Sequence, residues 1–472
     1  MKKRILACLL AVCMSVTVLA SCGGDDSSSK ADSTADLSVA DSSVPDSSSV
    51  ADDSSEADSS EDDSSEPEVE LTLSEQLLAQ YPASDSPIDV TAGCTENMLG
   101  RALIYQGDLT RLANVIKSAK DDLYKRTYIG MFGDSISAGS GASNGFLAYG
   151  NLIRKWWEEN VSVNVLLQQN SIGATDSYLA VHRFDNEVAE FDCNTDEEGI
   201  QNPDIIIIEY INDEATETYK ETMDSLVRKA LALPNNPAVI IMMPSTDGGY
   251  APQDIHLEVA QHYEVPFISF HDAVQPEIKA GNFTWADISP DTVHPNDAGH
   301  AMMAQMVEEL MQYTIDNMDT IGTEVTPFDP NMESLTGDKY ATADLADRKN
   351  TCDEVVVVDE GAFTIQSSKQ WPYINDWATY TGGSCTFEIT AKNIGFAYYK
   401  TTSGRNAVAT VEIDGEVVAQ IDGNFPGGWG NYTEIASLYT SDEVATHTVT
   451  ITVPECGEDE HAEFYIQAWL FS

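Results

Sequence analysis

Five short, almost continuously apolar runs restrict the fold of this chain more than any other feature. They span residues 128–132, 161–167, 205–208, 239–243 and 265–270. Segments with helical spacing lie before, between and after them, among them 108–124, 216–233, 255–262 and 297–318. Strands that helices cover on both faces are apolar throughout, because neither face meets water. The pattern predicts an α/β fold, a three-layer α/β/α sandwich around a five-stranded parallel sheet.

The last third of the chain has a different pattern. Strand-like runs separated by Gly, Asp and Asn turns follow one another at 354–358, 363–367, 386–390, 394–401, 407–414, 447–453 and 464–471. Several short strands at this spacing are typical of an antiparallel β-sandwich or jelly roll. We therefore expect one domain at 71–326, with a poorly patterned lead-in at its start, and an accessory domain at 327–472.

The amino-terminal segment has the features of a secretory signal peptide. Basic residues at positions 2–4 precede an apolar run at 5–18 and the small-residue string Leu19-Ala20-Ser21-Cys22. The apolar run is shorter than the roughly 20 residues that span a bilayer, although an uncleaved anchor helix remains an alternative. The string resembles a bacterial lipobox, which implies lipidation at Cys22. Residues 1–22 are therefore expected to direct the protein out of the cytoplasm, to a lipid-anchored position in the cell envelope.

Residues 23–70 are expected to form a disordered stalk. From Asp25 to Glu70 the chain carries 16 acidic residues against one lysine, and almost nothing large and apolar. Such a segment cannot bury enough surface to offset its conformational entropy. An acidic interaction tail is the alternative interpretation. This segment contributes −15 to the net charge of −54, so the remainder is also acidic, which excludes nucleic acid as an expected partner because phosphates are bound by Lys and Arg.

The cysteines indicate neither a disulfide framework nor a metal site. Beyond residue 22 the chain has Cys94, Cys193, Cys352, Cys385 and Cys456, widely spaced and without a CxxC pair. Pairing of Cys352 with Cys385 or Cys456 stays open. We expect neither a metal nor a cofactor.

The turn Gly133-Asp134-Ser135 supplies a candidate nucleophile. It follows the first apolar run, and ligands of open α/β sheets bind at the carboxyl ends of strands. Asp134 is expected to brace the turn by hydrogen bonding. A serine hydroxyl needs an adjacent base, itself oriented by a third group. Asp291 and His294, three residues apart in one loop, are expected to supply the orienting carboxylate and the base.

Other readings of these segments compete with this one. Asp287 and Asp297 also lie near His294 and are alternatives for its orientation, although acids flanking a loop are usually solvated. Ser143 stands in a literal GxSxG motif, but no strand precedes it as that motif requires. Glycines at 139, 141 and 145 suggest a dinucleotide loop, but their spacing is GxGxxxG and the expected acidic residue is missing.

Four short blocks in this order resemble those of SGNH (GDSL-type) serine hydrolases, over about residues 108–318. They are Gly133-Asp134-Ser135-Ile136, Asn170-Ser171-Ile172-Gly173-Ala174, Asn212-Asp213 and Asp291-x-x-His294. The resemblance implies a flavodoxin-like α/β/α fold with Ser135 as nucleophile, His294 as base and Asp291 as its orienter.

The same resemblance implies an oxyanion hole. Its donors would be the backbone N–H groups of Ser135 and Gly173 and the side-chain amide of Asn212, which suit a tetrahedral intermediate. One residue departs from the pattern, since Tyr210 occupies a position that is usually glycine. A side chain of this size is expected to reshape the acyl pocket or to shift the Asn212 loop.

Aromatic residues in the accessory region raise the question of sugar binding. They are Trp371, Tyr373, Trp377, Trp429, Tyr432 and Trp469. Most are expected in the sandwich core, Trp469 in particular because it lies in a strand-like run. Trp429 lies in a glycine-rich loop, where exposure is expected more than in a strand, and it is the candidate for glycan binding, with a purely structural role as the alternative. The region loosely resembles jelly-roll carbohydrate-binding modules.

These observations predict a cell-surface serine esterase that removes acyl groups, acetyl in particular, from polysaccharides or small molecules. Two alternatives remain. One is a lipase or O-acyltransferase acting on envelope components with the same triad, and the other is a non-catalytic glycan-binding surface lipoprotein. The seven histidines other than His294 have no ligand spacing and are expected at the surface or on helices.

Overall fold

Alternate residues of the central strands face opposite ways, and each set contributes to a separate core. Ile205 and Ile207 belong to one apolar cluster, whereas Ile206 and Ile208 belong to the other. This is why the apolar runs are continuous, as parallel strands covered on both faces must be. The computed structural model describes residues 71–189, 202–349, 351–368, 371, 374–457 and 460–472, and these described residues belong to one compact unit. The predicted signal peptide, stalk and lipidation site at Cys22 lie outside the described residues, as do Cys193 and Tyr373.

The first sheet of the described chain has six strands in the order β1-β6-β5-β4-β2-β3. They are β1 (Leu103–Tyr105), β2 (Thr127–Gly133), β3 (Val165–Gln169), β4 (Ile205–Glu209), β5 (Ala238–Met243) and β6 (Phe267–Ser269). Strands β2 to β6 pair in parallel, which confirms the predicted α/β class. Strand β1 is an addition that the sequence analysis did not include, and it pairs antiparallel with β6 at the sheet edge.

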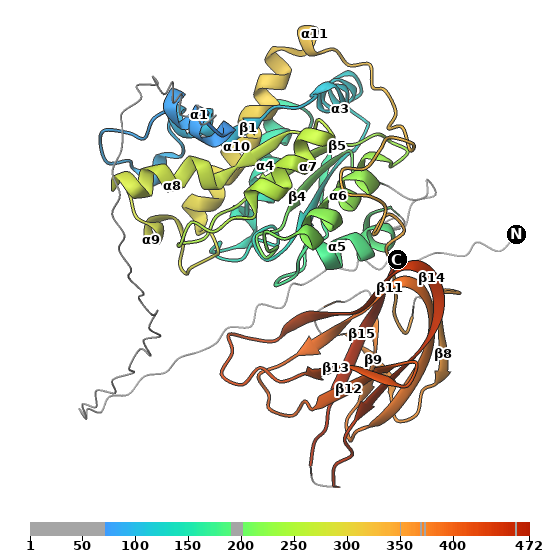
Figure 1. The fold of residues 1–472 in the computed structure, drawn as a ribbon. Helices are drawn as coiled ribbons and strands as arrows, with labels where there is room; N and C mark the ends of the chain where they lie inside the picture. The colour runs from blue at the N-terminus through green and yellow to red at the C-terminus, as the bar shows by residue number, and fades with distance from the viewer. Residues whose placement is uncertain (1–70, 190–201, 350, 369–370, 372–373, 458–459) are drawn as a thin grey trace, which may run out of the picture. The chain divides into compact units, whose positions relative to one another are not determined.

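Helices cover both faces of this sheet (Figure 1). One face packs against α3 (Thr110–Asp121), α4 (Tyr149–Asn160), α8 (Phe270–Ala280) and α10 (Asp297–Asp316). The other packs against α5 (Ser177–Phe184), α6 (Glu217–Leu231) and α7 (Gln253–His262). Short helices complete the region: α1 (Leu73–Gln80), η1 (Val90–Ala92), α2 (Glu96–Ala102), η2 (Gly145–Leu147), η3 (Asp185–Ala189), α9 (Trp285–Ile288) and α11 (Met318–Ile321). No helix within the described ranges has the length and apolar character needed to cross a bilayer.

The lead-in is held by a buried ion pair as well as by apolar side chains such as Met98 and Ala102. Arg101 of α2 lies 2.6 Å from Glu277 of α8, and both side chains are almost fully buried. The Arg101 guanidinium also donates to the carbonyls of Tyr81 and Pro82. A buried charge is tolerated when its partners satisfy its hydrogen bonds. Residues after α1 are thereby fixed against the α/β region.

The carboxy-terminal region is an antiparallel β-sandwich, as predicted. In the described chain its strands follow the order β13-β12-β14-β11-β15-β10-β9, with β7 beside β15 and β8 beside β11. They are β7 (Asp344–Ala346), β8 (Val355–Asp359), β9 (Thr364–Ser367), β10 (Asn375–Thr379), β11 (Gly383–Lys400), β12 (Val408–Ile413), β13 (Glu416–Asp422), β14 (Tyr432–Val453) and β15 (Phe464–Phe471). The runs at 386–390 and 394–401 are parts of one strand, β11.

The sandwich shares a core with the helices on one face of the α/β sheet. Tyr178 and Phe184 of α5 cluster with Trp371, Ala468 and Leu470 of the sandwich. Residues 322–343, all described, connect the two regions without a helix or strand. The domain boundary at 326 and 327 stays a prediction, because the two regions are continuous in packing.

Candidate active site

Ser135 lies at the carboxyl end of β2, in a turn that begins at Gly133, where no larger residue fits. A Cβ atom on Gly133 would lie 2.5 Å from the Glu209 carbonyl oxygen and 2.5 Å from the Ser137 hydroxyl. The Asp134 carboxylate accepts the Ile136 N–H at 2.9 Å, so Asp134 braces the turn as expected. Ser135 itself is partly exposed and lines a pocket.

His294 and Asp291 extend from Ser135 as a chain of hydrogen bonds. His294 Nε2 lies 2.9 Å from Ser135 Oγ, and His294 Nδ1 lies 2.8 Å from Asp291 Oδ2. An ionised carboxylate can only accept, so Nδ1 carries the proton and Nε2 is free to accept the serine proton. The structure therefore brings together the three residues that the sequence singled out.

Asp291 is held in its ionised form by the loop around it. Partial burial opposes ionisation, but the backbone N–H groups of His294 and Val293 and the His294 ring outweigh it and lower the pKa of Asp291. Those N–H groups donate to Oδ1 at 2.7 and 2.8 Å. The Trp285 indole N–H donates to the Asp291 carbonyl at 2.7 Å, which fixes the loop from its other side.

The competing residues are engaged elsewhere. Asp287 accepts the backbone N–H and the hydroxyl of Thr284 at 2.7 and 2.8 Å and so caps α9. Asp297 accepts the backbone N–H and the hydroxyl of Ser143, each at 2.7 Å. Of the three acids, Asp291 is the one bonded to the His294 ring, and Ser143 is bonded to a carboxylate rather than to a base.

The two remaining oxyanion candidates lie at the same pocket. A Cβ atom on Gly173 would lie 3.5 Å from the Ser135 Cβ atom, so the Gly173 backbone passes close to the serine. The Asn212 amide nitrogen donates to Asp134 Oδ2 at 2.9 Å and to the Thr175 carbonyl at 3.0 Å. Both amide protons of Asn212 are thus engaged by the protein.

A buried pair of carboxyl groups lies beneath the nucleophile turn. Glu209, the last residue of β4, accepts the backbone N–H and the hydroxyl of Ser137 at 3.1 and 2.7 Å. The Ile211 N–H is shared between Glu209 and Asp134. Burial raises the pKa of both carboxyls, and the proximity of Glu209 raises that of Asp134 further. The sequence analysis missed Glu209, although an acidic residue that ends an all-isoleucine strand was a signal for it.

Tyr210 is buried in the core and does not line the pocket. Its hydroxyl accepts a hydrogen bond from Arg183 at 3.1 Å. Arg183 also donates to the Asn170 carbonyl at 2.6 Å and pairs with Glu187 at 2.5 Å. Glu187 in turn accepts the indole N–H of Trp371 from the sandwich. Although Tyr210 stands at a position that is usually glycine, its side chain therefore does not line the pocket.

The pocket has a volume of about 660 Å³, and residues of both regions line it. Ser135, His294 and Asp291 share it with Trp429 and Tyr432 from the sandwich. Trp429 is 70% exposed and stacks on Tyr432, with ring centroids 4.9 Å apart. The loop that carries the candidate glycan-binding residue Trp429 thus lies at the pocket that contains Ser135.

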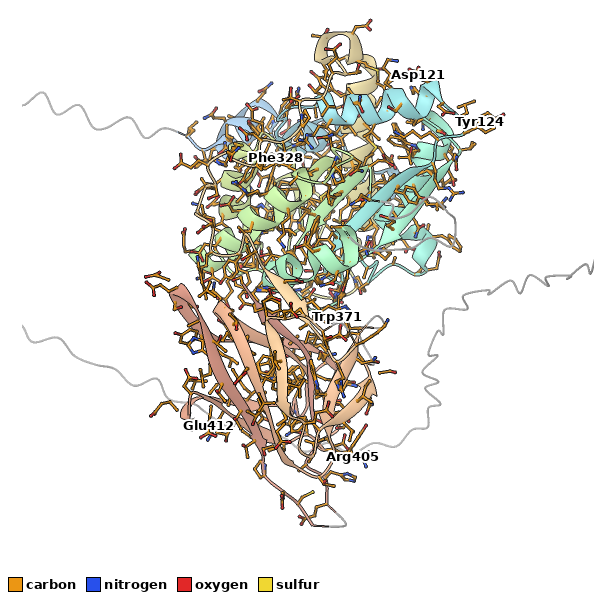
Figure 2. The ribbon with its side chains drawn as sticks, turned by 90° about the vertical axis from the view of Figure 1, so that its right-hand side faces the viewer. Asp121, Tyr124, Phe328, Trp371, Arg405 and Glu412 are labelled. Atoms are coloured by element: carbon orange, nitrogen blue, oxygen red, sulfur yellow. The ribbon has the colours of Figure 1, made fainter. Side chains whose placement is uncertain are left out.

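The other described tryptophans of the sandwich are buried. Trp377 and Trp469 lie in the sandwich core, and Trp371 lies where the sandwich meets the α/β region (Figure 2). Cys352, Cys385 and Cys456 are free thiols in the structure. No group of three or more His, Cys, Asp or Glu side chains within the described ranges is arranged to hold a metal ion.

This chain matches a family model and is similar to solved structures. Residues 131–302 match the model of the GDSL-like Lipase/Acylhydrolase family. A comparison with curated proteins gave no match. Among solved structures, a two-domain esterase (CEX) active on acetylated mannans, co-crystallised with mannopentaose, is 28% identical with a TM-score of 0.67, covering 79% of this chain and 96% of its own. A second structure, described as a two-domain esterase (CEX) active on acetylated mannans, is 27% identical with the same TM-score, covering 79% and 97%.

Proposed function

We propose that this chain, a carboxylic ester hydrolase with a GDSL-like lipase/acylhydrolase domain, removes acetyl groups from polysaccharides through Ser135. The observation that carries the proposal is the hydrogen-bonded series from Ser135 through His294 to Asp291, at a pocket open to solvent. A serine so placed next to a neutral imidazole is an activated nucleophile.

The reaction follows from the positions of these three side chains. His294 Nε2 takes the proton of Ser135 Oγ as that oxygen attacks the ester carbonyl carbon. The tetrahedral intermediate collapses, His294 protonates the departing sugar alkoxide, and an acetyl-serine remains. Water, deprotonated by His294, then attacks the acetyl carbon, and acetate leaves as Ser135 Oγ regains its proton. Asp291 stabilises the imidazolium at each transfer.

The developing oxyanion would be bound by the Ser135 and Gly173 backbone N–H groups, with the Asn212 amide as third donor. Asn212 must release one of its present contacts before it can donate to the intermediate, because both of its amide protons are engaged. The contact with the Thr175 carbonyl is a neutral one, whereas that with Asp134 involves a buried carboxyl. We infer that the Thr175 contact is the one exchanged.

An acetylated polysaccharide is the substrate class that the pocket fits best. The proteins similar over most of the chain are esterases active on acetylated mannans. Trp429 presents an exposed aromatic ring at the same pocket as Ser135. The lining includes polar residues such as Asn212, Thr292 and Asn431, whose groups can hydrogen-bond sugar hydroxyls.

We also propose that the mature protein is anchored to the outer side of a membrane through lipid on Cys22, with residues 23–70 as a stalk. The Leu-Ala-Ser-Cys string and the acidic low-complexity segment support this placement. The expected result is that Cys22→Ala moves the protein from the membrane fraction to the soluble fraction. Retention of this variant in membranes would argue for an uncleaved anchor helix instead.

Acetate release from a panel of acetylated glycans tests the proposed function. We expect wild-type protein to release acetate from acetylated mannan, and the Ser135→Ala variant to lose at least about 10³-fold of that rate. Hydrolysis of long-chain lipid esters in preference to every glycan would instead indicate the lipase alternative.

A further inference from the structure

A second hollow adjoins the pocket and takes no part in the hydrolysis described above. It has a volume of about 490 Å³. Asn212 and Val293 line both spaces, so the two spaces are neighbours that share part of their walls. Its other walls include Tyr250, Thr246 and Glu214. The hollow therefore lies next to the pocket, within reach of a ligand longer than one sugar.

Tyr250 presents its ring to the hollow in a fixed orientation. The side chain is 44% exposed, yet its hydroxyl donates to the Asp213 carbonyl at 2.5 Å. Its backbone N–H donates to the Thr246 hydroxyl at 3.0 Å, and the Thr246 N–H donates to the Tyr250 carbonyl at 3.2 Å. Gly249 closes this turn at φ +73°, a conformation that favours glycine. An aromatic ring held at its hydroxyl and at its backbone loses little entropy when a ligand packs on it.

The turn that carries Tyr250 is also bonded to the loop that carries His294. The Asp247 N–H donates to the Thr292 carbonyl at 2.9 Å. Thr292 lies between Asp291 and His294 in sequence and lines the pocket. The ring of Tyr250 is therefore kept at a set distance from the reacting serine, as a subsite for a neighbouring part of the same ligand requires.

We propose that this hollow is a sugar subsite, in which Tyr250 stacks on a residue of a neutral polysaccharide next to the acetylated one. The inference rests on the proposed function and extends it to the class of chain that is bound. Ligand pockets combine aromatic walls with a few polar groups that fix orientation. Here the ring of Tyr250 supplies the aromatic wall, and the carboxylate of Glu214 supplies a polar group for sugar hydroxyls.

The charges around both spaces select against acidic glycans. Among the residues that the structure describes, neither lining includes a lysine or an arginine, whereas Glu214 and Asp291 contribute carboxylates. Carboxylate or phosphate groups on a ligand are bound by Arg or Lys and repelled by these acids. Sugar hydroxyls, in contrast, can donate to Glu214. The subsite therefore fits hexose or pentose units without uronic acid or phosphate groups.

The experiment compares wild-type full-length protein with Tyr250→Ala on three substrates. These are an acetylated neutral oligosaccharide of several sugars, the acetylated monosaccharide and p-nitrophenyl acetate. We expect kcat/KM on the oligosaccharide to fall about tenfold, on the order of 1.4 kcal/mol of binding, with the other two substrates unchanged. The matched control is Tyr313→Ala on α10, a tyrosine of similar exposure (41%) that lines neither space and should leave all three rates unchanged.

Either of two results with Tyr250→Ala would overturn the subsite. Equal losses of Tyr250→Ala on all three substrates would mean that the residue only positions the Asp213 loop. No loss on the oligosaccharide would mean that the ring binds nothing. The Tyr250→Phe variant keeps the ring and removes its hydrogen bond, so it should retain most of the oligosaccharide activity. A loss as large as that of Tyr250→Ala would contradict stacking.

Binding in a Ser135→Ala background separates this proposal from the proposed function. Wild-type protein that turns over p-nitrophenyl acetate but no glycan would contradict the proposed substrate class directly. In the Ser135→Ala background, calorimetry with a neutral oligosaccharide should give a Kd about tenfold higher once Tyr250→Ala is added. An unchanged Kd would overturn the subsite, and so would equally tight binding of a uronic acid oligosaccharide.

Discussion

Two Asp–His pairs with the same separation lie in two different surroundings. His294 Nδ1 and Asp291 Oδ2 are 2.8 Å apart, as are His256 Nε2 and Asp213 Oδ2. The first pair is partly exposed, at 29% and 49%, and its imidazole faces Ser135. The second is almost fully buried, at 1% and 0%, and its carboxylate also accepts the Ser177 N–H at 2.8 Å. The pair geometry alone therefore does not make a base. His294 can act as a base because solvent and the Ser135 hydroxyl reach its ring. The buried His256–Asp213 pair instead fixes the loop that carries Asn212.

The largest effect should separate the two histidines. We expect His294→Ala to lower kcat on p-nitrophenyl acetate by at least about 10³-fold, because the serine loses its base, with a change of less than about 1 kcal/mol in the free energy of unfolding. His256→Ala should instead lower the free energy of unfolding and leave kcat nearly unchanged. Removal of one partner from a buried pair costs about 3 kcal/mol of stability, while activity per folded molecule stays within a few-fold of wild type. Denaturant titration measures the free energy of unfolding of each variant, and steady-state kinetics measure kcat. Similar losses of kcat in the two variants would contradict the distinction between the two pairs.

The next effect concerns the loop that the buried pair supports. Asn212→Ala should lower kcat by roughly 10²- to 10³-fold, since one donor to the oxyanion is lost. KM should change little, because the donor acts on charge that forms only after attack. Steady-state kinetics on p-nitrophenyl acetate provide the measurement. An unchanged kcat would show that Asn212 keeps its contacts with Asp134 and Thr175 throughout the reaction.

A smaller effect tests the buried carboxyl pair beneath Ser135. Burial raises the pKa of Glu209 from 4.5 to about 7, so the folded state binds its proton more tightly than the unfolded state. That contribution to stability is complete below pH 4.5 and is lost as the pH rises through about 7. Wild-type stability should therefore fall by about 1–3 kcal/mol across this range, and by less in Glu209→Gln. Thermal unfolding at several pH values measures the difference. The control is Glu309→Gln, at an exposed position on α10, whose stability should change with pH as that of the wild type does. If the stability of Glu209→Gln also fell with pH as steeply as that of the wild type, the raised pKa of Glu209 would be contradicted.

The smallest effect tests whether the sandwich supports the catalytic loops. Trp371 donates to Glu187, and Glu187 pairs with Arg183, which holds Asn170 and Tyr210 just before the two oxyanion segments. Trp371→Phe removes that hydrogen bond and should lower kcat two- to fivefold with KM unchanged, in line with about 1 kcal/mol for one such bond.

The matched control for Trp371→Phe is Trp377→Phe in the sandwich core. The indole N–H of Trp377 is buried and has no hydrogen-bond partner among the described residues, so this variant breaks no hydrogen bond. It should leave kcat unchanged. Equal kcat values for the two variants would show that the sandwich does not act through Glu187.

The sequence predicted what depends on local spacing. The five parallel strands follow from apolar runs, and Asp291 lies close enough to His294 in sequence for one loop to orient both. Strand β1 was missed because three residues carry no period, and β11 was divided because polar residues interrupt its apolar pattern. The Asp213–His256 pair joins residues on different elements, and the Trp371–Glu187 contact joins distant parts of the chain. Such contacts depend on tertiary packing and leave no signal in spacing.

Labelling with a serine-directed sulfonyl fluoride tests the central claim most directly. Mass spectrometry of the digested protein should find the adduct on the peptide that contains Ser135, in stoichiometric yield. The same treatment of His294→Ala should give almost none, because the hydroxyl is then no longer activated. An adduct on Ser143, or full esterase activity in protein whose Ser135 is completely modified, would contradict the account.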